Sequence, residues 1–236
     1  MNHFGNRLLV EVRMLSTLAL MGAIRNSSPS CEHALGIRID ADFAPTQALV
    51  ARLRAGERPD LVVLTREGLN EAIDIGLVLE DTAIDLARSY VGLAVRAGSG
   101  HPDISTEAAL RRTLTDARSI AYSRFGASGI YFVKLIQRLG IADEMKAKAT
   151  VIEQGFTAER LLTGEADVAV QQISELNQVE GIEVVGPIPF ELQTPALFAA
   201  GRLTSADNPA AVDLVLKFLI SPGVALALRQ SGLEPQ

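Results

Sequence analysis

"IRIDADFAPTQALVARLRAGERPDLVVLT", residues 37–65, is the stretch that decides the fold. Residues 37–43 alternate apolar and polar side chains, which predicts a strand, and residues 60–65 form a second short apolar run. Between them, apolar side chains recur at helical spacing over residues 46–55, and Gly56 follows as a stop signal. A strand, a helix and a strand in this order predict two parallel strands joined by a right-handed crossover.

The same alternation continues on both sides of this unit. Toward the N-terminus, residues 8–12 predict a strand, and a helix is expected from Ser16. A helix is also expected over residues 67–76, so the first part of the chain is an α/β series. The further strands predicted are residues 90–98, 119–123, 148–154, 167–172, 182–189 and 193–201, with two C-terminal helices split at Pro222. No low-complexity linker interrupts the series, so two lobes would have to be joined by strands.

The composition excludes several classes of protein. The chain has 236 residues, 48% of them hydrophobic, and a net charge of -6, which is typical of a globular protein. No Lys/Arg-rich run stands out, so nucleic acid is not expected as a partner. The single Cys31 cannot form an internal disulfide. The histidines His3, His33 and His101 have no metal-ligand spacing, so we expect neither a metal nor a cofactor.

The N-terminal segment has only part of a signal-peptide pattern. Arg7 supplies a basic start, but Glu11 and Arg13 interrupt the apolar run, and no small-residue cleavage site follows. No stretch reaches the roughly 18 apolar residues of a membrane span. As the sequence stands, this predicts a cytoplasmic protein, or a periplasmic one if a leader has been removed.

Four predicted strand ends are followed by a small or hydroxyl residue and then by a helix. The hydroxyl residues are Ser16, Thr46, Ser128 and Thr157. In an open α/β sheet, ligands bind beyond the carboxyl ends of the strands, and a helix start offers free N–H groups and about half a positive charge. Several such starts facing one cleft would bind an anion without a metal. Ordinary N-capping, which Ser and Thr favour everywhere, is the alternative.

Two arginines and a pair of glutamines are predicted in the same turns. Arg13 and Arg124 each offer a charged fork that suits a carboxylate better than a tetrahedral oxyanion. A solvated arginine or a structural ion pair is the alternative for each. Gln171 and Gln172 close the strand predicted over 167–172, where they offer donors and acceptors to a ligand or to the neighbouring loop.

Motifs of the common enzyme classes are absent from the sequence. There is no P-loop, no G-x-S-x-G, no H-E-x-x-H and no dinucleotide-binding glycine motif after the first strand. Ser128 has no histidine nearby in sequence, although distance in sequence does not exclude a triad. The catalytic residues, if there are any, are therefore unassigned by motif.

Four stretches together resemble a known fold family. They are "FAPTQALVARLRAGERPDLVVLT" (43–65), "RSIAYSRFGASGIYFVKLIQRLGI" (118–141), "LLTGEADVAVQQISEL" (161–176) and "FLISPGVALALRQSGLEP" (218–235). The chain resembles the type II periplasmic-binding-protein fold, in particular its molybdate-binding-protein-like branch. The resemblance implies an α/β protein of two lobes, with mixed sheets flanked by helices and joined by two crossover strands. It places residues 1–88 and 193–236 in lobe I and residues 89–192 in lobe II.

The resemblance also implies where a ligand would bind. Carried over residue by residue, the anion-contacting positions are Ser16, Thr46, Ala127 or Ser128, Thr157 and Gln172. Gln172 stands where many family members have a tyrosine, and Gln47 stands where they have a serine. These two departures point away from molybdate and tungstate and toward a different anion.

Three hypotheses for the function follow from this resemblance. The first is a solute-binding-protein-like binder of a small anion, a di- or tricarboxylate, in the interlobe cleft, with an ABC permease as partner if the protein is exported. The same branch includes aconitate isomerase, which moves a double bond in a tricarboxylic acid, so an isomerase of a small carboxylic acid is the alternative. Its base would be Glu175, Tyr131 or Tyr122. The third is a cytoplasmic sensor, or a protein that kept only the fold.

Overall fold

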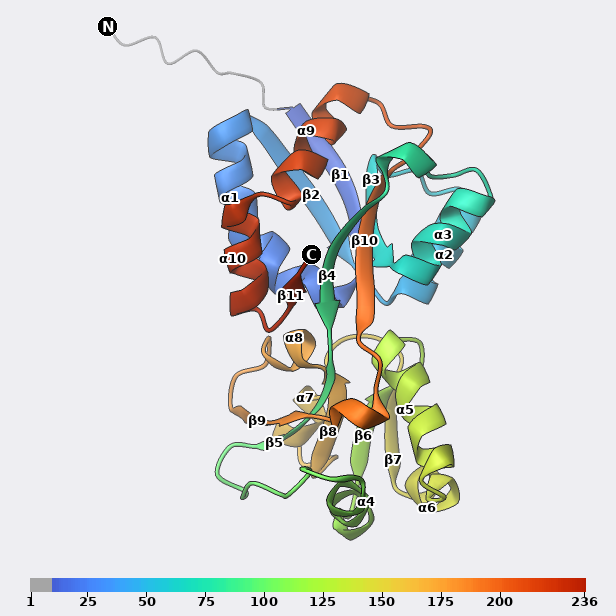
Figure 1. The fold of residues 1–236 in the computed structure, drawn as a ribbon, viewed down its shortest axis with the longest axis vertical. Helices are drawn as coiled ribbons and strands as arrows, with labels where there is room; N and C mark the ends of the chain where they lie inside the picture. The colour runs from blue at the N-terminus through green and yellow to red at the C-terminus, as the bar shows by residue number, and fades with distance from the viewer. Residues whose placement is uncertain (1–9) are drawn as a thin grey trace, which may run out of the picture.

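A computed structural model describes residues 10–236 as two α/β lobes, one above the other, each with its own sheet (Figure 1). The strands of lobe I are β1 (Val10–Ser16), β2 (Ile37–Phe43), β3 (Leu61–Thr65), β4 (Ile84–Ser89), β10 (Ala196–Arg202) and β11 (Glu234–Pro235). They form one sheet in the order β11-β4-β10-β3-β1-β2. Its helices are η1 (Leu18–Leu20), α1 (Met21–Leu35), α2 (Thr46–Arg54), α3 (Arg66–Asp74), η2 (Glu80–Thr82), α9 (Pro209–Leu219) and α10 (Pro222–Gln230).

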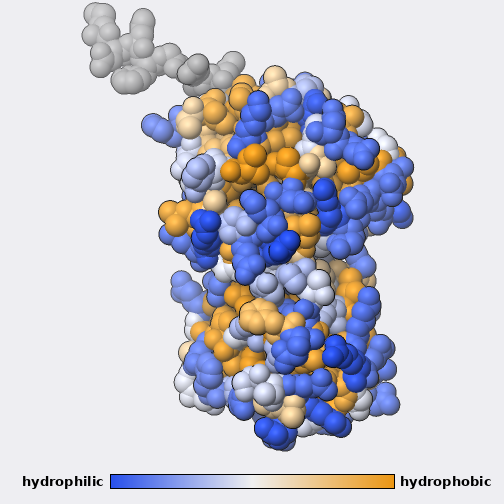
Figure 2. Space-filling view, in the orientation of Figure 1, coloured by the Kyte–Doolittle hydropathy of each residue, from blue (hydrophilic) through white to orange (hydrophobic). Residues whose placement is uncertain are grey.

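Lobe II is built in the same way on five strands in the order β7-β6-β8-β5-β9. The strands are β5 (Val91–Arg96), β6 (Ile120–Ser123), β7 (Ala149–Ile152), β8 (Val168–Gln172) and β9 (Ile182–Pro187). The helices are α4 (Glu107–Asp116), α5 (Ala127–Arg138), α6 (Ala142–Ala147), α7 (Glu159–Leu162), α8 (Ile173–Leu176) and η3 (Phe190–Leu192). Figure 2 shows the lobes as two rounded masses with a notch on either side of their junction.

Both sheets mix parallel and antiparallel pairs, as expected. β1 runs parallel to β2 and β3, which confirms the predicted parallel direction of these strands, whereas β10 runs antiparallel to β3 and β4. Side chains alternate between the two faces of each sheet. On β1, Val12 and Met14 enter one core cluster and Leu15 enters another, so each face needs its own cover of helices. Full burial of such a side chain stabilises the fold by roughly 1.5–3 kcal/mol.

The chain passes between the lobes twice, and one side chain ties the two passages together. The first passage runs from β4 through Tyr90 into β5, and the second runs from η3 into β10. Gln193 Oε1 accepts a hydrogen bond from the Val91 N–H at 2.9 Å, and its Nε2 donates to the carbonyls of Val91 and Ile188. The Tyr90 and Phe190 rings also meet edge to face, with centroids 5.1 Å apart.

Some sequence predictions for the elements were wrong or incomplete. Ser16 does not begin a helix, because it is the last residue of β1, and η1 begins at Leu18. β4 was not predicted, because Asp85 and Arg88 interrupt its apolar pattern. Residues 8 and 9 of the predicted first strand lie outside the described residues. The predicted lobe boundaries at 88/89 and 192/193 stay a prediction.

Within residues 10–236, no single helix is long and apolar enough to cross a membrane. Helices α9 and α10, which meet at 59°, together have the length and apolar composition of a bent span. Apolar side chains from both helices, such as Val215 and Leu228, are buried in the core of lobe I.

Gly129 is predicted to be essential for stability, because α5 packs directly on the end of β6. A Cβ at Gly129 would lie 1.6 Å from the carbonyl oxygen of Ser123. We expect Gly129→Ala to lower the free energy of unfolding, measured in urea, by about 3 kcal/mol or more. Gly223→Ala is the control, because a Cβ there would meet no atom within 4 Å. An unchanged urea midpoint in Gly129→Ala would contradict the close approach.

Candidate functional site

A narrow cleft separates the lobes where the carboxyl ends of several strands meet. Lobe I lines it with Thr17, Leu18, Pro45, Thr46 and Phe198. Lobe II lines it with Ser123, Gly126, Ala127, Glu153, Gln154, Gly155, Gln171, Gln172 and Glu175. The cavity volume is about 10 Å³, which is room for at most a single water molecule. A larger ligand can therefore enter only when the lobes separate.

Two helices point their N-termini into this cleft from opposite lobes. The N–H groups of Ala127, Ser128 and Gly129 at the start of α5 have no acceptor within residues 10–236. At the start of α2, Thr46 follows Pro45, and both residues line the cleft. Each helix start carries about half a positive charge. Together they favour a negatively charged ligand without a metal.

Three buried side-chain oxygens beside the cleft have no hydrogen-bond partner among the described residues. They are Ser123 Oγ, Ser128 Oγ and Gln172 Oε1. A Cβ at Gly126 would lie 2.5 Å from Ser123 Oγ and 3.8 Å from Ser128 Oγ, so both hydroxyls flank the start of α5. Buried polar atoms are nearly always hydrogen-bonded, so these three indicate a place for a polar ligand.

Glu175 brings a buried carboxyl group into the same cleft. Its side chain is only 7% exposed, and Oε2 accepts a hydrogen bond from the Gln172 N–H at 3.3 Å. Burial raises the pKa of Glu175 to about 8, and hydrogen bonds from Gln172 and Gln171 only partly oppose the shift. The carboxyl therefore changes its protonation state near neutral pH, which is where a proton-transfer group is most useful.

The structure brings some of the predicted site residues together and leaves others behind the cleft wall. Thr46, Ala127 and Gln172 line the cleft, and Ser128 lies beside it. Thr46 Oγ1 also accepts a hydrogen bond from the Thr65 N–H at 3.1 Å. Thr157 does not line the cleft. Both its N–H and its Oγ1 donate to Gln171 Oε1, at 2.8 and 3.0 Å.

Ser16 lies behind the wall as well. Its side chain is fully buried, and Oγ donates to the carbonyl of its neighbour Thr17 at 3.1 Å. Thr17, which was not predicted as a site residue, lines the cleft in its place. Ser123 was also missed. The available signal was its position as the last residue of a predicted strand that precedes a small-residue helix start.

Neither predicted arginine lines the cleft. Arg13 lies inside β1 and not in a turn, and it donates to the Arg58 carbonyl at 2.5 Å, close to Asp60. Arg124 does follow β6, but its Nε lies 3.9 Å from Glu153 Oε1 at the exposed rim. The residues that line the cleft include no Lys, Arg or His among those that the structure describes. A ligand's charge would be balanced by helix starts, not by a buried guanidinium.

Of the three side chains considered as a base, only Glu175 lines the cleft. Tyr122 is buried in the core of lobe II, with its ring centroid 5.2 Å from that of Phe132. Tyr131 donates to the Leu192 carbonyl at 3.1 Å, and burial raises its pKa to about 12. Neither tyrosine is placed to take a proton from a ligand in the cleft.

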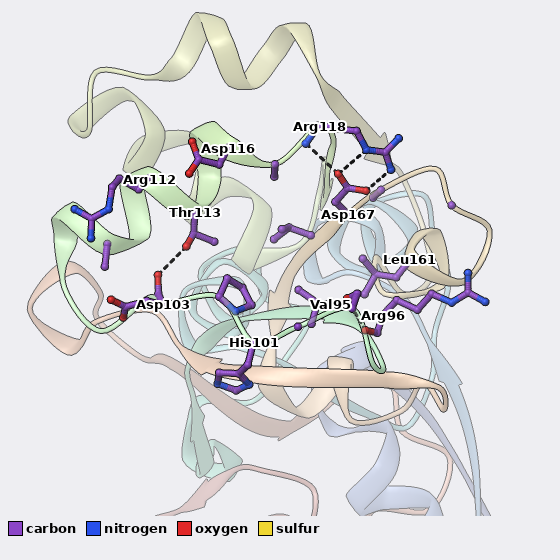
Figure 3. A pocket seen from close by; sticks show the side chains of 18 residues that line it. Val95, Arg96, His101, Asp103, Arg112, Thr113, Asp116, Arg118, Leu161 and Asp167 are labelled. Carbon is purple, nitrogen blue, oxygen red and sulfur yellow. Dashed lines mark hydrogen bonds and ion pairs between the residues drawn. The ribbon is translucent and has the colours of Figure 1, made fainter.

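A second cavity of about 760 Å³ lies in lobe II between α4, the strand ends and the turn at 164–168 (Figure 3). Its three arginines are matched by three aspartates, and Arg118 is paired with Asp167 through Nε at 3.1 Å. None of the unpartnered buried side-chain atoms found in residues 10–236 lines it. No group of three or more potential metal-binding His, Cys, Asp or Glu side chains occurs in that range either. The interlobe cleft is the stronger candidate site.

Two sheets flanked by helices, two chain passages and a cleft faced by helix starts define the class of the protein. It has the type II periplasmic-binding-protein fold, in its molybdate-binding-like form. The chain belongs to the bacterial extracellular solute-binding protein family, whose sequence model matches residues 12–234.

Individual relatives differ in what their names say they do. The chain is 35% identical to an aconitate isomerase of Pseudomonas sp. over 233 residues, which is 96% of this chain and 88% of that protein. The periplasmic molybdate-binding protein of Azotobacter vinelandii has a TM-score of 0.82 at 14% identity, covering 94% of this chain and 98% of that one. A periplasmic thiamin-binding protein has a TM-score of 0.76 at 15% identity, covering 98% and 85%. At such low identity, these two structures show the fold alone.

Glu175 is predicted to make stability depend on pH. Its pKa is about 8 in the folded protein and about 4.5 as a free side chain, so the folded state holds a proton that the unfolded state releases. The contribution of Glu175 to the free energy of unfolding should therefore be largest below pH 4.5 and should fall as the pH rises toward 8. We expect Glu175→Gln to remove this fall, and above pH 8 to exceed the parent by about 3 to 5 kcal/mol in urea unfolding. Parallel pH profiles for both proteins would contradict the burial of a titrating carboxyl.

Proposed function

We propose that the protein binds a small di- or tricarboxylic acid in the interlobe cleft and isomerises it by moving a carbon–carbon double bond. Glu175 is the observation that carries this proposal, because a simple anion receptor has no evident use for a buried, acidic group beside its ligand. The identity to an aconitate isomerase over nearly the whole chain supports the same reaction class.

The reaction requires one proton to move along the substrate. The ionised Glu175 would take a proton from the carbon between the double bond and a carboxyl group. The electron pair left behind forms the new double bond. The protonated Glu175 then returns the proton to the far carbon of the former double bond. Atoms and charges balance, and no oxidant or cofactor takes part.

The surroundings of Glu175 suit the charge that develops during this transfer. The free N–H groups of Ala127, Ser128 and Gly129 lie at the positive end of α5, where they favour carboxylates and the delocalised anion between them. Ser123 Oγ and Ser128 Oγ can donate further hydrogen bonds to the substrate. The small side chain at Ala127 and the missing one at Gly126 let a carboxylate approach the backbone closely.

Binding without turnover is the second candidate function. It is favoured by the match to the extracellular solute-binding family, in which the cleft alone would serve to capture a solute. This candidate implies a position outside the cytoplasm and a membrane permease as partner.

Proton NMR with cis- and trans-aconitate in D₂O should test the proposal. We expect the two isomers to interconvert, with solvent deuterium entering at carbon to the extent that the proton on Glu175 exchanges with solvent before it is returned. Glu175→Gln should reduce kcat/KM by about 100-fold or more, the usual contribution of a general base. The kcat/KM of the parent should rise with pH and level off above about 8, where Glu175 is ionised.

The control variant is Glu180→Gln, which removes an exposed carboxyl five positions further along the chain and should leave turnover unchanged. Thermal stabilisation by tricarballylate, a saturated analogue, reports binding separately from turnover. Stabilisation without any interconversion would support the receptor. Stabilisation by molybdate but not by carboxylates would contradict carboxylate binding in both forms.

A further inference from the structure

The short helix α8 belongs to lobe II but packs against lobe I. It follows β8 directly, and Figure 1 places it at the top of lobe II, facing α1 and α10. Asn177 Nδ2, just after α8, donates to the carbonyl of Ser231 at the end of α10, at 3.4 Å. The Ile173 N–H at the start of α8 donates to the Tyr90 carbonyl in the first passage between the lobes, at 2.9 Å. Both ends of the helix are therefore held at the lobe junction.

Two glycines of lobe I make room for this segment. A Cβ at Gly22, in the first turn of α1, would lie 2.5 Å from Gln178 Nε2. A Cβ at Gly232 would lie 2.8 Å from Asn177 Nδ2. The amide of Gln178 is fixed in turn, because Nε2 donates to the Ser174 carbonyl at 3.2 Å. The segment is in contact with lobe I along its length.

The same segment carries Glu175, which lines the cleft together with Thr17, Leu18 and Phe198 of lobe I. The cleft has room for at most a single water molecule, and the lobes must separate to admit a ligand. Separation would move α8 away from α1 and α10 and would admit water to the carboxyl. Closure would reverse both changes, so the position of the lobes and the environment of Glu175 are linked.

We propose that Asn177 and Gln178, packed on Gly22, Ser231 and Gly232 of lobe I, form an interlobe latch that positions Glu175 and buries its carboxyl on closure. Asn177 and Gln178 are positioning residues, since they act on the cleft only through α8. The latch itself consists only of contacts between the end of α8 and lobe I. Its effect on turnover rests on the proposed function.

Few charged groups face Glu175, and the latch residues themselves are neutral. α8 packs on β5, β8, β9, η1 and α1, and no charge on these elements contributes to the raised pKa of Glu175. Glu153 is the other carboxyl that lines the cleft, and its side chain is 64% exposed near Arg124. The Tyr90 hydroxyl, in the first passage between the lobes, donates to Glu234 Oε2 at 3.4 Å. The protonation state of Glu175 therefore reports mainly on how well its carboxyl is shielded from water.

The test is a carbon-13 NMR titration of the Glu175 carboxyl in the ligand-free protein, with the signal assigned by its loss in Glu175→Gln. Two variants loosen the latch in different ways. Gly22→Leu places a bulky side chain between the lobes, where Gln178 now lies. The double variant Asn177→Ala/Gln178→Ala removes the contacts of these two side chains with lobe I without adding bulk. Gly223→Leu is the matched control, because Gly223 is also the second residue of a lobe I helix but has open space around it.

We expect both latch variants to shift the Glu175 titration midpoint downward by at least about one pH unit, while Gly223→Leu leaves it unchanged. Where turnover is measurable, the acidic limb of kcat/KM against pH should move by the same amount. An ordinary midpoint in the parent, or the same midpoint in all variants, would overturn the latch. The titration uses no substrate, so a failure to isomerise aconitate would overturn the proposed function and leave the latch standing.

Discussion

The arrangement of the site depends on the double passage of the chain between the lobes, which Gln193 ties together. Its amide bonds the backbone of Val91 in the first passage and of Ile188 before the second, so neither passage can shift alone. A single tether would let the lobes adopt many orientations, whereas two tied passages restrict them to opening and closing. The helix starts of α2 and α5 therefore face each other across one cleft.

None of the described residues that line the cleft has a basic side chain that could balance the charge of an anionic ligand. The positive ends of helices supply fixed, partly desolvated charge that costs no side-chain entropy to hold in place. Glu175 adds a group whose charge is adjustable, because burial keeps it protonated near neutral pH. In the proposed reaction Glu175 must ionise beside an anionic ligand, so the positive helix ends also offset the repulsion between the two negative charges.

Much of the fold could be predicted from local pattern. The strand at 37–43, the helix start at Thr46 and the parallel pairing of β1, β2 and β3 follow from periodicity and connection rules, and all were confirmed. β4 could not be found in this way, because it is held by β10 and β11 on its two sides and not by its own apolar pattern. Arg13 was placed wrongly because the first strand was predicted to end at residue 12, whereas β1 continues to Ser16, so Arg13 lies inside the strand and not in a turn.

The sequence by itself determined the α/β class, the order of the elements and the small-residue helix start at "FGASG", because periodicity, capping and chain flexibility act over a few neighbouring residues. Only the tertiary structure decided which of the polar residues share a cleft. It places Gln172 and Ser123 at the cleft, and Thr157 and Ser16 behind it. It also buries the Glu175 carboxyl, which raises the pKa of that group. Burial and dielectric environment arise from groups far apart in the chain, so no local pattern encodes them.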